Sequence, residues 1–146
     1  MINLPILYFG YLIVLFSIIG FGYLSSKLLS IRLSLGELGL SGILFMTILS
    51  YITNLFVSHS YIHNIIFLTI GLFSFFLILK KRLFRKKIKL ILLVSSVLFI
   101  GILMYKTHDD FFYYHFHYTI SLIEFKKIFG VGNLEHGWRT PSSIFY

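Results

Sequence analysis

The chain has 146 residues, of which 58% are hydrophobic and only 12% are charged, with a formal net charge of +8. A water-soluble domain of this size needs more charge on its surface, so the composition indicates an integral membrane protein. Nucleic-acid binding is disfavoured despite the positive charge, because seven of the thirteen basic residues lie between Lys80 and Lys89. The chain contains no cysteine, which excludes disulfides and thiolate metal sites.

Four apolar segments approach the length of about 20 residues that crosses a bilayer. In chain order they cover residues 4–24, 38–57, 62–79 and 88–105. The first segment is predicted to be a retained span and not a signal peptide, because the preceding "MIN" carries no basic side chain. The expected fold class is all-α, a polytopic transmembrane bundle with about four spans within residues 1–105.

Basic residues in the connecting loops predict the orientation of these spans. Residues 25–37 contain two basic side chains and residues 80–87 read "KKRLFRKK", whereas the turn "SHSYIH" between them has no Lys or Arg. The positive-inside rule therefore places residues 25–37 and 80–87 in the cytoplasm. The N-terminus, the "SHSYIH" turn and residues 106–139 then face the periplasm or the exterior. Binding of anionic lipid head groups is a second interpretation of the basic loop.

The external segment, residues 106–139, differs from the rest of the chain in composition. It holds four of the five acidic residues and four of the six histidines. Residues 109–129 are predicted to form an amphipathic helix that lies along the membrane surface. Its apolar positions recur at helical spacing at Leu122, Phe125 and Phe129. His59 and His63, which flank the other external turn, are interpreted as ordinary polar loop residues.

Residues 140–146 are predicted to begin a further span. Thr140 and Pro141 have the character of a helix N-cap followed by a proline in the first turn. The sequence stops a few residues later, so we expect the chain to be the N-terminal part of a longer polytopic protein.

The adjacent acids Asp109 and Asp110 follow the fourth predicted span and have three interpretations. Acids in the first turn of a helix are stabilised by the helix dipole, so capping alone can account for them. A carboxylate at this depth can also take the proton from an acceptor hydroxyl that attacks a lipid-linked sugar. The pair can instead hold a divalent cation against a phosphate, and such a cation is the one cofactor that the sequence suggests.

Histidines and basic residues of the same segment supply further candidates. His115 and His117 are two residues apart and therefore lie on different sides of a helix, which disfavours a zinc site. A leaving phosphate could be neutralised by cationic side chains, among which arginine makes two-point contact with phosphate oxygens. The candidates for this role are Lys126, Lys127, His136 and Arg139. Ordinary solvated charge is the alternative for all four.

The stretches "DDFFYYH" and "GVGNLEHGWRTPSSIFY" resemble a family of bacterial multi-spanning membrane proteins related to the GT-C glycosyltransferases. In that family an Asp after an early span is followed by a Tyr-His pair, and Asp110, Tyr114 and His115 match this spacing. Later positions of the family pattern match Gly130, Asn133, Leu134, Ser142 and Ser143. The family often carries His-Gly-Arg directly after Asn-Leu, whereas this chain reads Glu-His-Gly-Trp-Arg up to Arg139.

The resemblance implies an enzyme of the bacterial inner membrane that uses a polyprenyl-phosphate-linked sugar. It implies that Asp110, with Asp109 second, acts as catalytic base or metal ligand. Substrate or phosphate contacts would come from Tyr114, His115, His136 and Arg139. The remaining spans of the full-length protein would supply much of the donor site, so this chain alone is expected to be inactive. The alternative is a non-catalytic flippase, exporter or polymerase subunit of the cell envelope.

Overall fold

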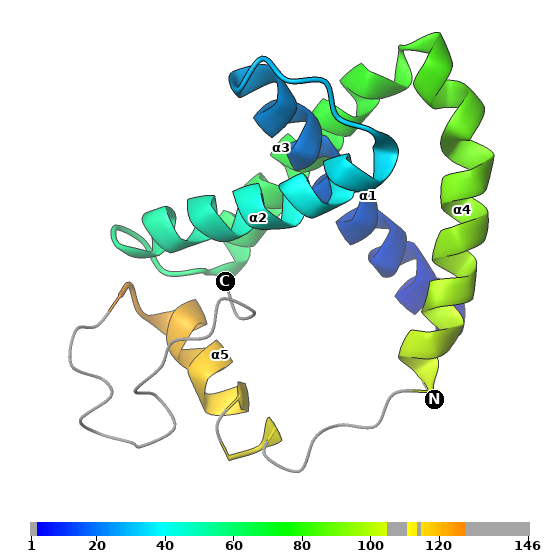
Figure 1. The fold of residues 1–146 in the computed structure, drawn as a ribbon. Helices are drawn as coiled ribbons and strands as arrows, with labels where there is room; N and C mark the ends of the chain where they lie inside the picture. The colour runs from blue at the N-terminus through cyan, green and yellow to red at the C-terminus, as the bar shows by residue number, and fades with distance from the viewer. Residues whose placement is uncertain (1–2, 105–110, 114, 128–146) are drawn as a thin grey trace. The chain divides into compact units, whose positions relative to one another are not determined.

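The computed structural model describes residues 3–104, 111–113 and 115–127. These residues form helices and connecting turns and contain no strand, which confirms the predicted all-α fold class (Figure 1). In chain order the helices are α1 (Leu4–Leu28), α2 (Leu35–Asn54), α3 (Tyr61–Leu79), α4 (Arg82–Leu103) and α5 (His115–Glu124). Five of the predicted site residues lie outside the described ranges: Asp109, Asp110, Tyr114, His136 and Arg139. Residues 140–146, the predicted start of a further span, lie outside them as well.

Three helices are long and apolar enough to cross a membrane, and they correspond to the first three predicted spans. These are α1, α2 and α3. The fourth predicted span corresponds to α4, which begins at Arg82, before the predicted boundary at residue 88. The helix extends through the basic stretch because Lys and Arg are good helix formers. Because of these charges, α4 is not among the three helices whose composition fits a membrane span.

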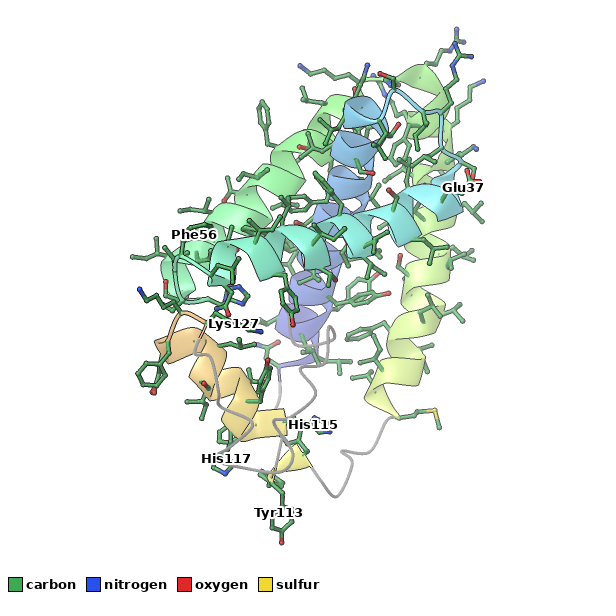
Figure 2. The ribbon with its side chains drawn as sticks, turned by 60° about the vertical axis from the view of Figure 1, so that its left-hand side comes forward. Glu37, Phe56, Tyr113, His115, His117 and Lys127 are labelled. Carbon is green, nitrogen blue, oxygen red and sulfur yellow. The ribbon has the colours of Figure 1, made fainter. Side chains whose placement is uncertain are left out.

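The one acid outside the external segment, Glu37, has a structural role at the start of α2 (Figure 2). Its carboxylate oxygen Oε2 accepts a hydrogen bond of 2.6 Å from the backbone N–H of Ser34. The carbonyl of Ser34 accepts the first helical bond, from the N–H of Leu38. Glu37 therefore closes the N-terminal turn of α2 as the Glu of a capping box does.

The chain forms two compact units, and α2 and α3 contribute to both. The first unit comprises residues 1–45 and 67–106, and the second comprises residues 46–66 and 107–146. The first unit has a core built from all of its helices, whose buried members are Ile19, Leu38, Phe75, Ile78, Phe84 and Ile91. Phe16 of α1 stacks on Phe75 of α3 within this core, with ring centroids 4.5 Å apart.

Glycines allow the backbones of the first unit to come into contact. A Cβ atom at Gly20 of α1 would overlap the carbonyl of Gly71 in α3. On a different side of α1, a Cβ at Gly22 would overlap the backbone of Leu38 in α2. Helices that associate in a bilayer favour such small residues, because close approach increases van der Waals packing. The first unit is therefore packed in the manner of a membrane helix bundle.

Helix α4 runs antiparallel to α1 within the first unit. Near the start of α1, the hydroxyl of Tyr8 lies 2.7 Å from the hydroxyl of Ser96, and its ring packs edge-on against Phe99 at 5.0 Å. Near the other end of α1, the ammonium of Lys81, directly before α4, lies 4.7 Å from the centre of the Tyr23 ring. Because α1 is a candidate membrane span, this pairing places the apolar part of α4 at membrane depth as well.

Candidate functional site

The candidate site is the second unit, in which α5 is attached to the turn between α2 and α3. The backbone N–H of His59 in this turn donates a 2.7 Å hydrogen bond to the carbonyl of Leu122 in α5. The N–H of Lys127, just beyond α5, donates a bond of the same length to the carbonyl of Asn54 at the end of α2. Two main-chain hydrogen bonds therefore attach α5 and the residues after it to the turn and to the end of α2.

Two histidines organise the turn. His59 is buried, and its Nε2–H donates to the carbonyl of Ser50 at 3.0 Å. Its ring stacks on that of His63 with centroids 4.7 Å apart, and Nε2 of His63 lies 3.0 Å from the hydroxyl of Thr53. The side-chain amide of Asn64 donates to the carbonyl of His59 at 3.1 Å. These histidines therefore have a structural role, because they tie α2 to the start of α3.

Burial lowers the pKa of His59 below its ordinary value of 6.5, since the charged imidazolium loses hydration. The hydrogen bond to the Ser50 carbonyl acts in the opposite direction, and a charge on His63 would lower the pKa further. The net effect keeps the His59 ring neutral at physiological pH, in the form whose Nε2–H donates to Ser50.

Acidification is expected to destabilise the second unit through His59. Because the folded-state pKa is below that of the unfolded chain, the unfolded state binds more protons as the pH falls. The stabilising contribution is complete above about pH 6.5 and is lost as the pH falls through the folded-state pKa. The slope of stability against pH is measured by thermal unfolding in detergent between pH 8 and pH 5. His59→Gln should flatten it, whereas His117→Gln, at an exposed position, should leave it unchanged.

Asn54 lies at the end of α2 with its side chain fully buried, and neither Nδ2 nor Oδ1 has a hydrogen-bond partner. A buried amide without partners is destabilising by about 1–3 kcal/mol. Only its backbone carbonyl takes part in the attachment of α5, through the bond from Lys127. Within the described part of the second unit, Asn54 is the one residue whose buried side-chain polar atoms have no hydrogen-bond partner.

Asn54→Leu is expected to stabilise the protein, by about 1–3 kcal/mol, because it removes the unpaired amide and keeps the backbone carbonyl. The matched control is Asn64→Leu, which removes an amide that donates to the His59 carbonyl and should destabilise. Unfolding temperatures of both variants in the same detergent make the comparison. A lower unfolding temperature for Asn54→Leu would show that the buried amide stabilises the fold.

Lys127 is held against α2 and is not a freely solvated cation. Its ammonium lies 4.5 Å from the centre of the Tyr51 ring and 3.4 Å from the tyrosine hydroxyl. The cation–π contact stabilises the position where the chain leaves α5. Lys126 beside it is exposed. Of the two lysines predicted to contact phosphate, Lys126 therefore has the more accessible charge.

The predicted helix at residues 109–129 is too long, since α5 covers only His115–Glu124. The chain leaves helical geometry after Glu124 because the N–H of Lys127 bonds to α2 and does not continue the helix. Leu122 is buried in the protein, whereas Phe125, directly after the end of α5, is 52% exposed. Phe129 lies outside the described residues.

The inner face of α5 is formed by His115 and Tyr118, which are half-buried, and by the buried Leu122. His117 is exposed, and Figure 2 shows the two imidazoles on different sides of α5. The prediction that His115 and His117 do not share a face is confirmed. Among the side chains that the structure describes, no three His, Asp or Glu are grouped so as to hold a metal ion. A cation at Asp109 and Asp110 stays a prediction.

The fold and the site define a helical membrane protein in which α5 is attached to the turn between two candidate spans. No protein family matches the chain, and neither a curated protein nor a solved structure is significantly similar to it. Function therefore has to be argued from the chain's own residues.

Proposed function

We propose that the chain is part of a GT-C-type glycosyltransferase of the bacterial inner membrane, which transfers a sugar from a polyprenyl-phosphate-linked donor at the non-cytoplasmic face. The attachment of α5 carries this proposal. Two main-chain hydrogen bonds hold α5 on the turn between α2 and α3. Asp109 and Asp110 come a few residues before α5 in the sequence, and we propose that their carboxylates act at the membrane face where α5 is held.

The proposed orientation places residues 25–37 and 80–87 in the cytoplasm. It is supported by Tyr23, whose ring is approached by Lys27 at 5.9 Å and by Lys81 at 4.7 Å. Both basic loops of the first unit therefore lie at one end of its helices, as the positive-inside rule requires. A helix of about 20 residues is about 30 Å long, so the turn that follows α2 belongs at the opposite membrane face.

In the proposed reaction, an acceptor hydroxyl oxygen attacks the anomeric carbon of the donor sugar. The bond between that carbon and the phosphate oxygen breaks, and polyprenyl phosphate leaves. Asp110 takes the hydroxyl proton as general base. Lys126, His136 and Arg139 are proposed to offset the charge on the leaving phosphate. The inner-face residue His115 and the neighbouring Tyr114 are proposed to position the sugar.

The test is a transfer assay with membranes from cells that express the complete gene product. Radiolabelled sugar on polyprenyl phosphate is added, and label in glycan or glycolipid is measured against membranes without the protein. Transfer that requires the protein supports the proposal. Label that moves across the bilayer while it stays on the polyprenyl carrier would instead identify a flippase, and lipid-linked chain extension without a new acceptor would identify a polymerase.

A further inference from the structure

We propose that α4 carries a binding site for an anionic phospholipid at the cytoplasmic end of the first unit. The head-group part of the site, here called the basic face, consists of Arg82, Arg85, Lys86 and Lys89. These residues are spaced i, i+3, i+4 and i+7 and therefore lie on one side of the helix. All four are exposed.

The rotation of α4 about its axis is set by its opposite side. Phe84 and Ile91 are buried in the core of the first unit, and Ile88 packs against that core. Phe84 also meets Phe75 of α3 edge-on, with ring centroids 5.9 Å apart. Because these contacts hold the apolar side inward, the basic face is kept on the outside of the bundle.

The side of α4 that carries the basic face continues along the helix as an apolar surface. Leu93, Val97 and Ile100 are 63%, 63% and 59% exposed. On a helix at membrane depth, exposed apolar side chains contact acyl chains. One continuous side of α4 therefore offers cations to a head group and apolar side chains to the tails, which are the two parts of a phospholipid.

The depth of the basic face in the bilayer matches that of lipid phosphates. A span of about 20 residues that ends at Leu103 begins near Phe84. Lys86 and Lys89 then lie within the first two turns of the span, and their long side chains extend back toward the head groups. Basic residues that only set the topology can lie anywhere in the loop. The charged ends of Lys86 and Lys89, by contrast, are expected to reach the level of the lipid phosphates.

The charges of the basic face have no counter-charge within α4 itself, since residues 82–103 include no Asp or Glu. The first turn of α4 contains no acidic residue, and like charges three and four residues apart repel each other. Cations at the N-terminal end of a helix are also disfavoured by the helix dipole. Lys81, by contrast, lies over the Tyr23 ring. An anionic phosphate would relieve the repulsion, which a zwitterionic head group does less well.

Lipid titration of the purified complete gene product in neutral detergent tests the proposal. Native mass spectrometry measures the apparent dissociation constants of phosphatidylglycerol and phosphatidylcholine. We expect wild type to bind phosphatidylglycerol more tightly. Lys86→Gln combined with Lys89→Gln should weaken phosphatidylglycerol binding about 30-fold, since each cation near the head groups contributes about a factor of five.

The control is Lys80→Gln combined with Lys87→Gln, which removes the same charge from the same loop but outside the basic face. It should weaken phosphatidylglycerol binding by less than about threefold, since Debye screening reduces the effect of distant charges. Equal weakening by both pairs, or equal binding of the two lipids to wild type, would overturn the proposal. Displacement of phosphatidylglycerol by an equal concentration of glycerol phosphate would do the same, because the tails would then contribute nothing.

Discussion

Gly20→Ala is expected to lower the unfolding temperature of the protein in detergent, by on the order of 5–10 °C. The added Cβ would overlap the carbonyl of Gly71, and this neighbour is backbone that cannot rotate away. Either α1 and α3 move apart or the local helix distorts, and both changes lose contacts along the interface. Overpacking of this kind is destabilising by about 1–3 kcal/mol. The larger side chain of Gly20→Leu should prevent the first unit from packing at all.

Gly10→Ala is the matched control for this substitution. Gly10 lies in the same helix, but a Cβ there would meet nothing within 4 Å. Alanine is favoured over glycine in a helix by about 0.5–1 kcal/mol, so Gly10→Ala should be neutral or slightly stabilising. The unfolding temperatures of the two variants are compared by size-exclusion chromatography after heating. If Gly20→Ala is as stable as Gly10→Ala, then α1 and α3 do not pack through Gly20 and Gly71.

Asp110→Asn is expected to reduce sugar transfer by the complete gene product about 10²–10⁴-fold, which is the usual contribution of a general base. The amide keeps the size and polarity of the side chain but cannot take up the acceptor proton. Membranes with equal amounts of wild-type and variant protein are supplied with labelled polyprenyl-phosphate sugar, and initial rates are compared. Asp109→Asn should have a smaller effect if Asp110 is the base.

Glu124→Gln controls for the loss of one negative charge from the external segment. Glu124 ends α5 and is exposed, so the substitution should leave both transfer and stability nearly unchanged. If Asp110→Asn retains full transfer but unfolds at a lower temperature, the acid acts as a helix cap. A divalent cation at the acid pair would be indicated by loss of wild-type transfer on addition of a chelator and its recovery with Mg²⁺.

The four apolar runs and their order could be read directly from the amino acids. About 20 apolar residues suffice to predict a helix in a bilayer, because every backbone polar group must be satisfied within the segment. Helix ends could also be predicted to within a few residues where nearby side chains determine them. The start of α4 was misjudged: this helix begins at Arg82, because Lys and Arg are good helix formers although they are not apolar.

The arrangement of the second unit could not be predicted in this way. His59 contacts Leu122 and Lys127 contacts Asn54 across more than sixty residues of sequence, and no local pattern marks such pairs. The same bond from Lys127 ended α5 at Glu124, before the predicted end of this helix at residue 129. The one available signal was the i, i+4 spacing of His59 and His63, which lets two rings stack on one side of the chain.

Composition and loop charge thus sufficed to predict a helical membrane protein with a basic end, because apolar length and charge are properties of each segment separately. Three-dimensional packing was needed for everything that joins segments. Contact of Gly20 with Gly71 depends on which faces of α1 and α3 meet, and the burial of His59 depends on a helix far along the chain. Such pairings are set by the sum of many weak contacts between distant residues, which a single stretch of sequence does not contain.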